Sequence, residues 1–200
     1  MKTIFNFKSA TLIFVAVLSF LCINSSYAVD KIWIGGNGNW NVATNWSPTG
    51  LPGSTDRVVF SQSGTYSINV DYNNSAIQGF YVNNASTNVT LSATAARNIY
   101  CSDVINVYSG NLTISTNIKI NLTSTSISYV WTGTTLTIAN SGCLAINNGT
   151  LRVLGTLSTN SVTNLSCSNG NTVIYMSSSA DQVVATGQYY NLTFNIIEKI

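Results

Sequence analysis

The dominant pattern in this chain is an alternation of apolar and polar residues over short stretches from about residue 66 onward. A period of two predicts β-strands with one buried face. Turn residues rich in Gly, Asn and Ser separate the stretches, and no helical period recurs beyond the first 28 residues. The clearest alternating stretches are 66–70, 89–91, 112–114, 118–122, 136–138 and 151–153. We therefore predict an all-β protein.

Three of these stretches resemble one another, because each places a turn before a Leu-x-Ile or Leu-x-Val strand. The copies are centred on Leu112, Leu136 and Leu151, so that they follow each other at 24 and then 15 residues. Irregular repeats of this kind are typical of a parallel β-helix (β-solenoid), in which successive coils stack and share one apolar interior. A β-sandwich is the alternative, since it also uses many short strands.

The composition fits a solenoid better than a sandwich. Charged residues make up 7% of the chain, hydrophobic residues 45%, and Ser, Thr and Asn are abundant. Those three polar types compete for backbone hydrogen bonds in helices, but they form turns and side-chain ladders readily. The favoured fold is thus a β-solenoid with Asn-rich corners.

Residues 1–28 have the features of a secretory signal peptide. Lys2 and Lys8 form a positive region, an apolar run follows, and Ser26-Tyr27-Ala28 offers a cleavage site after Ala28. The remaining chain holds six basic and six acidic residues and is neutral, so that we expect no nucleic-acid partner. The apolar run of the leader is too short for a comfortable membrane span, and we expect no span after cleavage. We expect a secreted, extracellular or cell-surface product.

A block rich in tryptophan follows this leader and supplies the candidate ligand-binding residues Trp33, Trp40 and Trp46. Exposed indole faces can stack on sugar rings, and the neighbouring Asn side chains can bind hydroxyl groups. The other interpretation is that these large aromatic residues close the end of the hydrophobic core. Trp131 lies in a strand-like stretch, whose pattern does not decide between core and solvent.

Two blocks resemble the β-helical passenger and repeat regions of large secreted bacterial surface proteins, autotransporter-like proteins or Bacteroidetes-type adhesins. The first block runs from Trp33-Ile34-Gly35 through Ala43-Thr44-Asn45-Trp46-Ser47 to Asp56-Arg57-Val58-Val59-Phe60, and the second runs from Thr172-Val173-Ile174-Tyr175 to Gln188-Tyr189-Tyr190-Asn191-Leu192. The resemblance implies a right-handed parallel β-helix and placement outside the cell or in association with the outer membrane. It implies no particular activity.

We expect three segments: the signal peptide 1–28, a Trp-rich cap with the first strand at 29–60, and solenoid repeats at 61–200. Relatives of the resembled type usually continue into further coils, so that we interpret the chain as a truncated or short member. An uncapped solenoid end exposes strand edges and apolar interior, which predicts a partner contact at the C-terminal end.

Candidate chemistry is sparse. The chain has no histidine, which removes Ser-His-Asp and Cys-His arrangements and most zinc sites. The one Glu is Glu198, and the weak candidate pairs are Asp56 with Arg57, and Asp71 or Asp103 with Arg97. The cysteines expected to remain, Cys101, Cys143 and Cys167, are odd in number and are interpreted as small apolar residues.

We therefore predict no catalytic residues, no metal and no cofactor. The expected function is a non-catalytic structural or adhesin-like surface module, whose partner is an extracellular polysaccharide or a protein of a host or cell surface. One alternative is a carbohydrate-binding module that uses exposed tryptophans. A second alternative is a polysaccharide lyase or hydrolase of the β-helix type.

Overall fold

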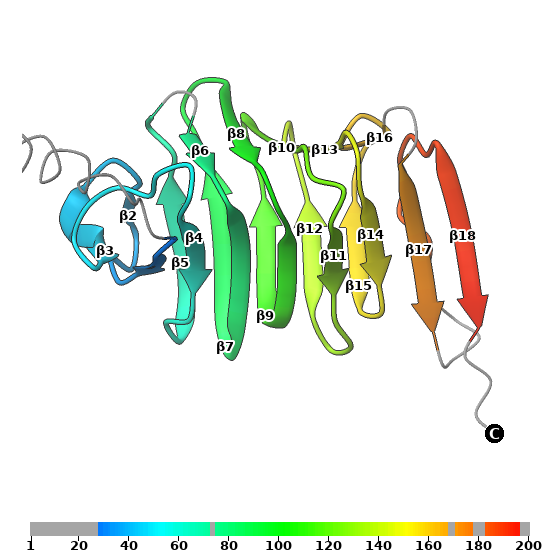
Figure 1. Cartoon of the computed structure of the whole chain (residues 1–200), viewed down its shortest axis with the longest axis horizontal. Coiled ribbons are helices and arrows are strands. Elements are labelled where there is room, and N and C mark those ends of the chain that lie inside the picture. The colour runs from blue at the N-terminus through cyan, green and yellow to red at the C-terminus, as the bar shows by residue number, and fades with distance from the viewer. Residues whose placement is uncertain (1–27, 73–74, 168–170, 178–182, 197–200) are drawn as a thin grey trace, which may run out of the picture.

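The computed structural model describes residues 28–72, 75–167, 171–177 and 183–196 (Figure 1). Within these ranges the chain is nearly all β-strand and forms a stack of about seven coils. The predicted signal peptide lies outside the described residues except for Ala28, as does the one glutamate, Glu198. No helix among the described residues is long and apolar enough to cross a membrane.

Each complete coil contributes three strand segments, and the stacked segments form three faces. The first face contains β1 (Asp30–Trp33), β4 (Arg57–Phe60), the beginnings of β7 (Gly79–Ser92) and β9 (Ile105–Ile114), β11 (Ile127–Val130), β14 (Thr150–Val153), β17 (Thr172–Ser177) and β18 (Asn191–Ile196). The second face contains β2 (Gly38–Asn39), β5 (Gly64–Asn69), the ends of β7 and β9, β12 (Thr135–Ile138) and β15 (Thr156–Thr159). The third face contains β6 (Ser75–Ile77), β8 (Arg97–Cys101), β10 (Ile118–Leu122), β13 (Cys143–Ile146) and β16 (Leu165–Cys167).

The strands of neighbouring coils pair in parallel, which confirms the predicted β-solenoid and makes the β-sandwich alternative wrong. On the first face, Asn106 pairs with Tyr129 and Ile127 pairs with Thr150, so that one coil takes 23 residues at each of these two steps. Parallel strands are joined by crossovers rather than hairpins, and here the other two faces provide the crossover. The one antiparallel pair among the described strands joins β1 to β3 (Trp46–Ser47) at the N-terminal end.

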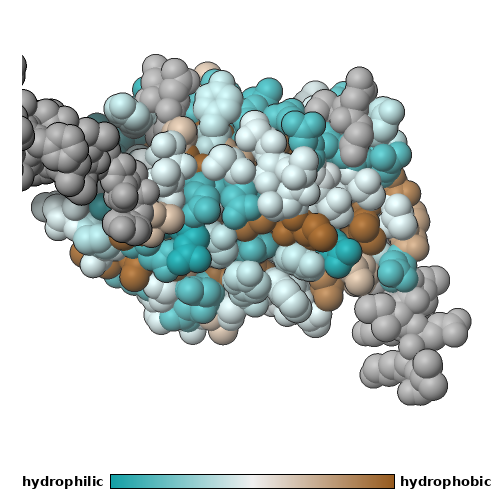
Figure 2. Space-filling model, viewed as in Figure 1, coloured by the Kyte–Doolittle hydropathy of each residue, from teal (hydrophilic) through white to brown (hydrophobic). Residues whose placement is uncertain are grey.

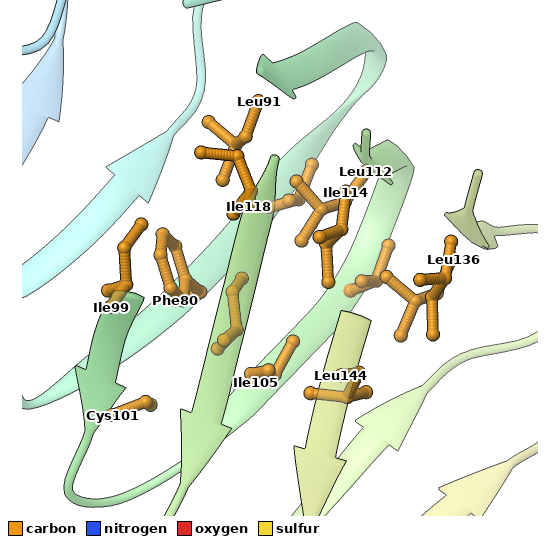
Figure 3. Close-up of a cluster of buried hydrophobic side chains, with 14 of the residues drawn as sticks. Phe80, Leu91, Ile99, Cys101, Ile105, Leu112, Ile114, Ile118, Leu136 and Leu144 are labelled. Carbon is orange, nitrogen blue, oxygen red and sulfur yellow. The ribbon is translucent and has the colours of Figure 1, made fainter. Parts of the chain in front are cut away.

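The apolar positions of the alternating stretches point into one continuous core. Tyr66 and Ile68 of β5 are 4% and 0% exposed, as the period of two predicts. Because the coils are in register, the inward apolar residues of one coil pack on inward apolar residues of the next coil, as the labelled side chains of Figure 3 show. One such column on the second face runs through Tyr66, Val89, Leu112, Leu136 and Leu157.

Of the two repeat steps predicted from the sequence, the structure confirms the first and not the second. Leu112 and Leu136 are direct neighbours in adjacent coils, which confirms the 24-residue step. Leu151 is not the next member of that column, because it lies on the first face and pairs with Ser128. The column continues instead at Leu157. The misassignment arose because a strand on any face of a triangular coil can carry the same Leu-x-Val pattern.

Asparagine occupies the corner between the second and third faces, as its abundance suggested. Asn117 and Asn140 take this corner in successive coils with φ of +62° and +55°, a left-handed backbone that Asn tolerates better than most residues. Nδ2 of Asn117 donates to the carbonyl oxygen of Ala93 in the coil before, at 3.1 Å. Nδ2 of Asn140 donates to Oγ of Ser115 at 2.9 Å. These contacts link corner to corner along the stack.

The two described ends of the stack differ. At the N-terminal end, the loop that holds η1 (Ala43–Asn45) and β3 packs beside the first coil (Figure 1). At the other end, the inward positions Leu192 and Phe194 of β18 are 38% and 59% exposed, although Phe194 stacks on Tyr175 with ring centroids 6.0 Å apart. The side of the molecule in Figure 2 is mostly polar and carries a narrow apolar band.

Candidate functional site

The three candidate tryptophans lie together at the N-terminal end of the core. Trp33, Trp40 and Trp46 are 0%, 1% and 0% exposed. Trp46 lies in the middle, edge to face with Trp33 at a centroid distance of 4.9 Å and with Trp40 at 4.8 Å. Trp40 continues the cluster to Phe80 of β7 at 6.3 Å. Edge-to-face packing of this kind adds to the stabilisation from burial alone.

The glycines of the same block make room for this cluster. A Cβ on Gly35 would lie 2.6 Å from Cγ of Asn45, and a Cβ on Gly38 would lie 2.9 Å from Nδ2 of Asn45. The Asn45 side chain thus fills the space beside both glycines, and its Nδ2 donates to the carbonyl oxygen of Asn39 at 3.0 Å. The indole N–H of Trp33 donates to the carbonyl oxygen of Gly36 at 2.9 Å. The block is thus a folded loop whose side chains pack into the N-terminal end of the core.

These findings locate the predicted sugar-stacking residues inside the protein. None of the three indole rings presents a face to solvent, so that Trp33, Trp40 and Trp46 cannot stack on a sugar in this conformation. The physical reason is the size of the rings: three indoles bury more apolar area at the end of the core than aliphatic residues would. The interpretation that they close the core agrees with their burial.

Two of the candidate carboxylates, Asp56 and Asp71, accept hydrogen bonds from the backbone. Asp56 does not pair with Arg57; its Oδ2 accepts from the backbone N–H of Gly53 at 2.9 Å. Arg57 pairs instead with Asp30 of the neighbouring strand at 2.6 Å. Oδ1 of Asp71 accepts from the backbone N–H of Asn41 at 3.0 Å. No group of three or more His, Cys, Asp or Glu residues suited to a metal ion occurs in the described part of the chain.

A second set of aromatic residues lies on the outside of the first face, and we call it the outer aromatic strip. Its members belong to three successive coils: Tyr81 of β7, Tyr108 of β9, Tyr129 of β11 and Trp131 directly after β11. Tyr108 and Trp131 are 45% and 38% exposed, whereas their neighbours Val107 and Val130 are fully buried. The alternation of the strands therefore points the valines inward and the aromatic rings outward.

The rings of the outer aromatic strip contact one another from coil to coil. The Tyr81 and Tyr108 centroids are 6.4 Å apart with an interplanar angle of 25°, and the Tyr108 and Trp131 centroids are 5.8 Å apart at 34°. Tyr129 and Trp131 are 5.3 Å apart at 25°. Since parallel strands are about 4.8 Å apart, one ring or ring pair per coil gives a continuous row along the solenoid axis.

A buried amide fixes the middle of this row. Asn106 is 6% exposed, and its Nδ2 donates to the hydroxyl oxygen of Tyr108 at 3.0 Å. Its Oδ1 accepts from the backbone N–H of Tyr129 in the next coil at 3.0 Å. Burial raises the pKa of the Tyr81 hydroxyl, and the nearby Asp103 carboxylate raises it further. The hydrogen bonds of Asn106 to Tyr108 and to the backbone of Tyr129 therefore pre-organise the strip.

An arginine lies at each end of the outer aromatic strip. Cζ of Arg57 lies 5.6 Å from the ring centroid of Tyr81, and Cζ of Arg152 lies 5.8 Å from that of Tyr129. Nη1 of Arg152 also donates to the Tyr129 hydroxyl oxygen at 3.3 Å. Within the described residues Arg57 forms the one ion pair, with Asp30, so that the Arg152 guanidinium has no carboxylate partner there.

The sequence contained a partial signal for this surface. Tyr129-Val130-Trp131 alternates as an outward-inward-outward triplet, and Trp131 was recognised as undecided between core and solvent. Tyr81 and Tyr108 were missed, because their proximity depends on the register between β7 and β9. That register shifts at two irregularities between Val82 and Asn88, which no simple repeat spacing would reveal.

Comparison with known proteins found no matching family model, no matching curated protein and no matching solved structure. The resemblance to β-helical regions of bacterial surface proteins therefore stays a prediction. What the chain can do must be inferred from its own surface.

Proposed function

We propose that this chain is a secreted or cell-surface, non-catalytic solenoid module that binds other surfaces in the manner of an adhesin. The observation that carries the proposal is the outer aromatic strip, in which Tyr108 and Trp131 are 45% and 38% exposed and their rings contact each other across neighbouring coils, 5.8 Å apart. Aromatic residues are enriched at the centres of binding interfaces, where they supply large contact areas at low entropic cost.

The scaffold supports such a role. Parallel coils stack in register, and the strip is held on strands β7, β9 and β11, except for Trp131, which directly follows β11. Functional side chains on rigid elements lose little conformational freedom on binding. The scarcity of charge, 7% of residues, means that affinity would come from many modest polar and apolar contacts rather than from long-range attraction.

The proposal is tested by expressing the full chain with a C-terminal epitope tag in a bacterium that has an outer membrane. The mass of the product should correspond to a chain that begins at Val29, and protease added to intact cells should remove the tag. Beads coated with the purified product should be retained on extracellular matrix under flow, and albumin-coated beads should not. A tagged protein that stays in the cytoplasm with residues 1–28 still attached would contradict the proposal. So would coated beads that are washed off as readily as the albumin-coated beads.

A further inference from the structure

The Arg152 end of the outer aromatic strip differs chemically from the Arg57 end. The charge of Arg57 is offset by Asp30 at 2.6 Å, and Asp103 is close enough to affect the Tyr81 hydroxyl. No ion pair is formed by Arg152 within the described residues. The strip therefore has a neutralised end, an aromatic middle and a cationic end.

The Arg152 guanidinium is held in place on the protein surface. It lies over the Tyr129 ring, donates to the Tyr129 hydroxyl oxygen, and is only partly exposed. An arginine fixed by such contacts loses less conformational freedom when it binds an anion, and its planar fork suits a carboxylate. Partial burial strengthens its attraction to an anion relative to a fully solvated charge.

The aromatic middle of the strip adds a second requirement. A ligand that follows the row passes Tyr129 and Trp131 of one coil and then Tyr108 of the coil before it, which is about 4.8 Å away. It needs apolar faces for the rings and hydroxyl groups for the tyrosine oxygens. Sugar rings combine both, and a linear polymer repeats them along its length.

We propose, on the basis of the proposed surface-binding function, that the outer aromatic strip binds an acidic polysaccharide, whose sugar rings pack on Trp131 and Tyr108 and whose carboxylate pairs with Arg152. A neutral polysaccharide would leave the Arg152 charge uncompensated. An acidic polypeptide offers carboxylates but no row of rigid rings with apolar faces. The ligand class is thus set by the combination of the two features.

The experiment titrates the full chain with polygalacturonate, alginate and hyaluronan, each beside its carboxyl-methylated ester, and follows binding by isothermal calorimetry. At least one acidic polymer should bind, and its ester should bind about ten- to a hundredfold more weakly. The Arg152→Gln variant should bind the acidic polymer more weakly than the parent protein by a similar factor. Lys119→Gln, which removes an exposed charge from β10 on the third face, should leave binding unchanged.

Trp131→Ser should also weaken binding of the acidic polymer by about tenfold, and circular dichroism with urea unfolding should show that all variants fold. Equal binding of acid and ester, equal effects of Arg152→Gln and Lys119→Gln, or no binding by any of the three acidic polymers would overturn the inference. If beads coated with the protein are still retained on matrix in that case, the surface-binding proposal stands and the partner belongs to another class, such as a protein.

Discussion

The indole N–H of Trp46 donates a hydrogen bond to the backbone carbonyl oxygen of Trp40 at 2.9 Å, and the two rings meet edge to face at 4.8 Å. Trp46 is thus held from both sides, since Trp33 packs on it at 4.9 Å. Trp46 is the member of the cluster that contacts both of the other tryptophans. Its removal should therefore deprive both neighbouring tryptophans of a ring contact.

Trp46→Ala should lower the free energy of unfolding by about 3–5 kcal/mol, because it leaves a cavity between two rings. Trp46→Phe should cost less, since it keeps most of the apolar area and loses the hydrogen bond to Trp40. Urea denaturation followed by far-UV circular dichroism measures both changes. A Trp46→Ala variant within 1 kcal/mol of the parent protein would show that the cluster does not support the core.

Gly110 and Gly133 form a matched pair for the cost of a side chain at a turn. Both have positive φ, +85° and +78°, but only Gly110 is crowded: a Cβ there would lie 2.4 Å from the carbonyl oxygen of Asn84. Gly133→Ala should cost about 1–2 kcal/mol from backbone strain. Gly110→Ala should cost clearly more, because backbone must move between β7 and β9. Equal urea midpoints for the two variants would contradict this packing.

Asn111 connects three coils of the second face. Its Nδ2 donates to Oδ1 of Asn88 at 2.6 Å, and its Oδ1 accepts from the backbone N–H of Thr135 at 3.0 Å. Asn111→Ala should therefore lower the free energy of unfolding by about 1–3 kcal/mol, because it leaves both neighbours without this partner. Asn148→Ala, at an exposed bend, should change it by less than about 0.5 kcal/mol. Thermal denaturation of both variants distinguishes a ladder from a merely polar surface.

Cys101 predicts a loss of stability at alkaline pH. Burial raises the pKa of its thiol to about 12, and the thiol donates to the carbonyl oxygens of Gln78 and Val104, both at 3.3 Å. Above about pH 9 the unfolded chain loses this proton while the folded chain keeps it, so that the unfolded state binds fewer protons and stability falls as pH rises.

The test for Cys101 is the urea midpoint measured from pH 8 to pH 10.5. It should fall steadily above pH 9 in the parent protein and less steeply in Cys101→Ser, which keeps a donor but does not titrate in this range. The decline that remains in the variant comes from Cys143, Tyr66 and Tyr81, whose pKa values burial also raises. Identical slopes for parent and variant would mean that the Cys101 thiol ionises with equal ease in both states.

The sequence specified inward positions better than outward ones. The period of two at Tyr66 and Ile68 followed directly from the strand pleat, and the pairing of Leu112 with Leu136 followed from the repeat. The faces of the coil could not be distinguished by that pattern, which is why Leu151 was placed in the wrong column. The alternation within a single strand predicts which side chains are buried. It does not predict to which of the three faces of the coil the strand belongs, because that depends on how successive strands are connected.

The outer surface was harder to predict for a related reason. Tyr108 and Trp131 are neighbours because their coils stack, not because of any local motif. The Trp33 block, by contrast, stood out in the sequence because its residues lie close together along the chain, and it forms part of the core. The residues of a tight loop are close together in the sequence and form a recognisable motif. The residues of a surface that spans several coils are separated in the sequence by the length of a coil.

The most direct test of the account is retention of coated beads on extracellular matrix for two double variants. Tyr108→Ser with Trp131→Ser removes two exposed rings of the outer aromatic strip, and Tyr72→Ser with Tyr100→Ser removes two rings exposed by 51% and 44% elsewhere on the solenoid. We expect retention to fall to the level of albumin beads in the first variant and to stay at the parent level in the second. Equal retention by both variants would contradict the claim that the strip is the binding surface.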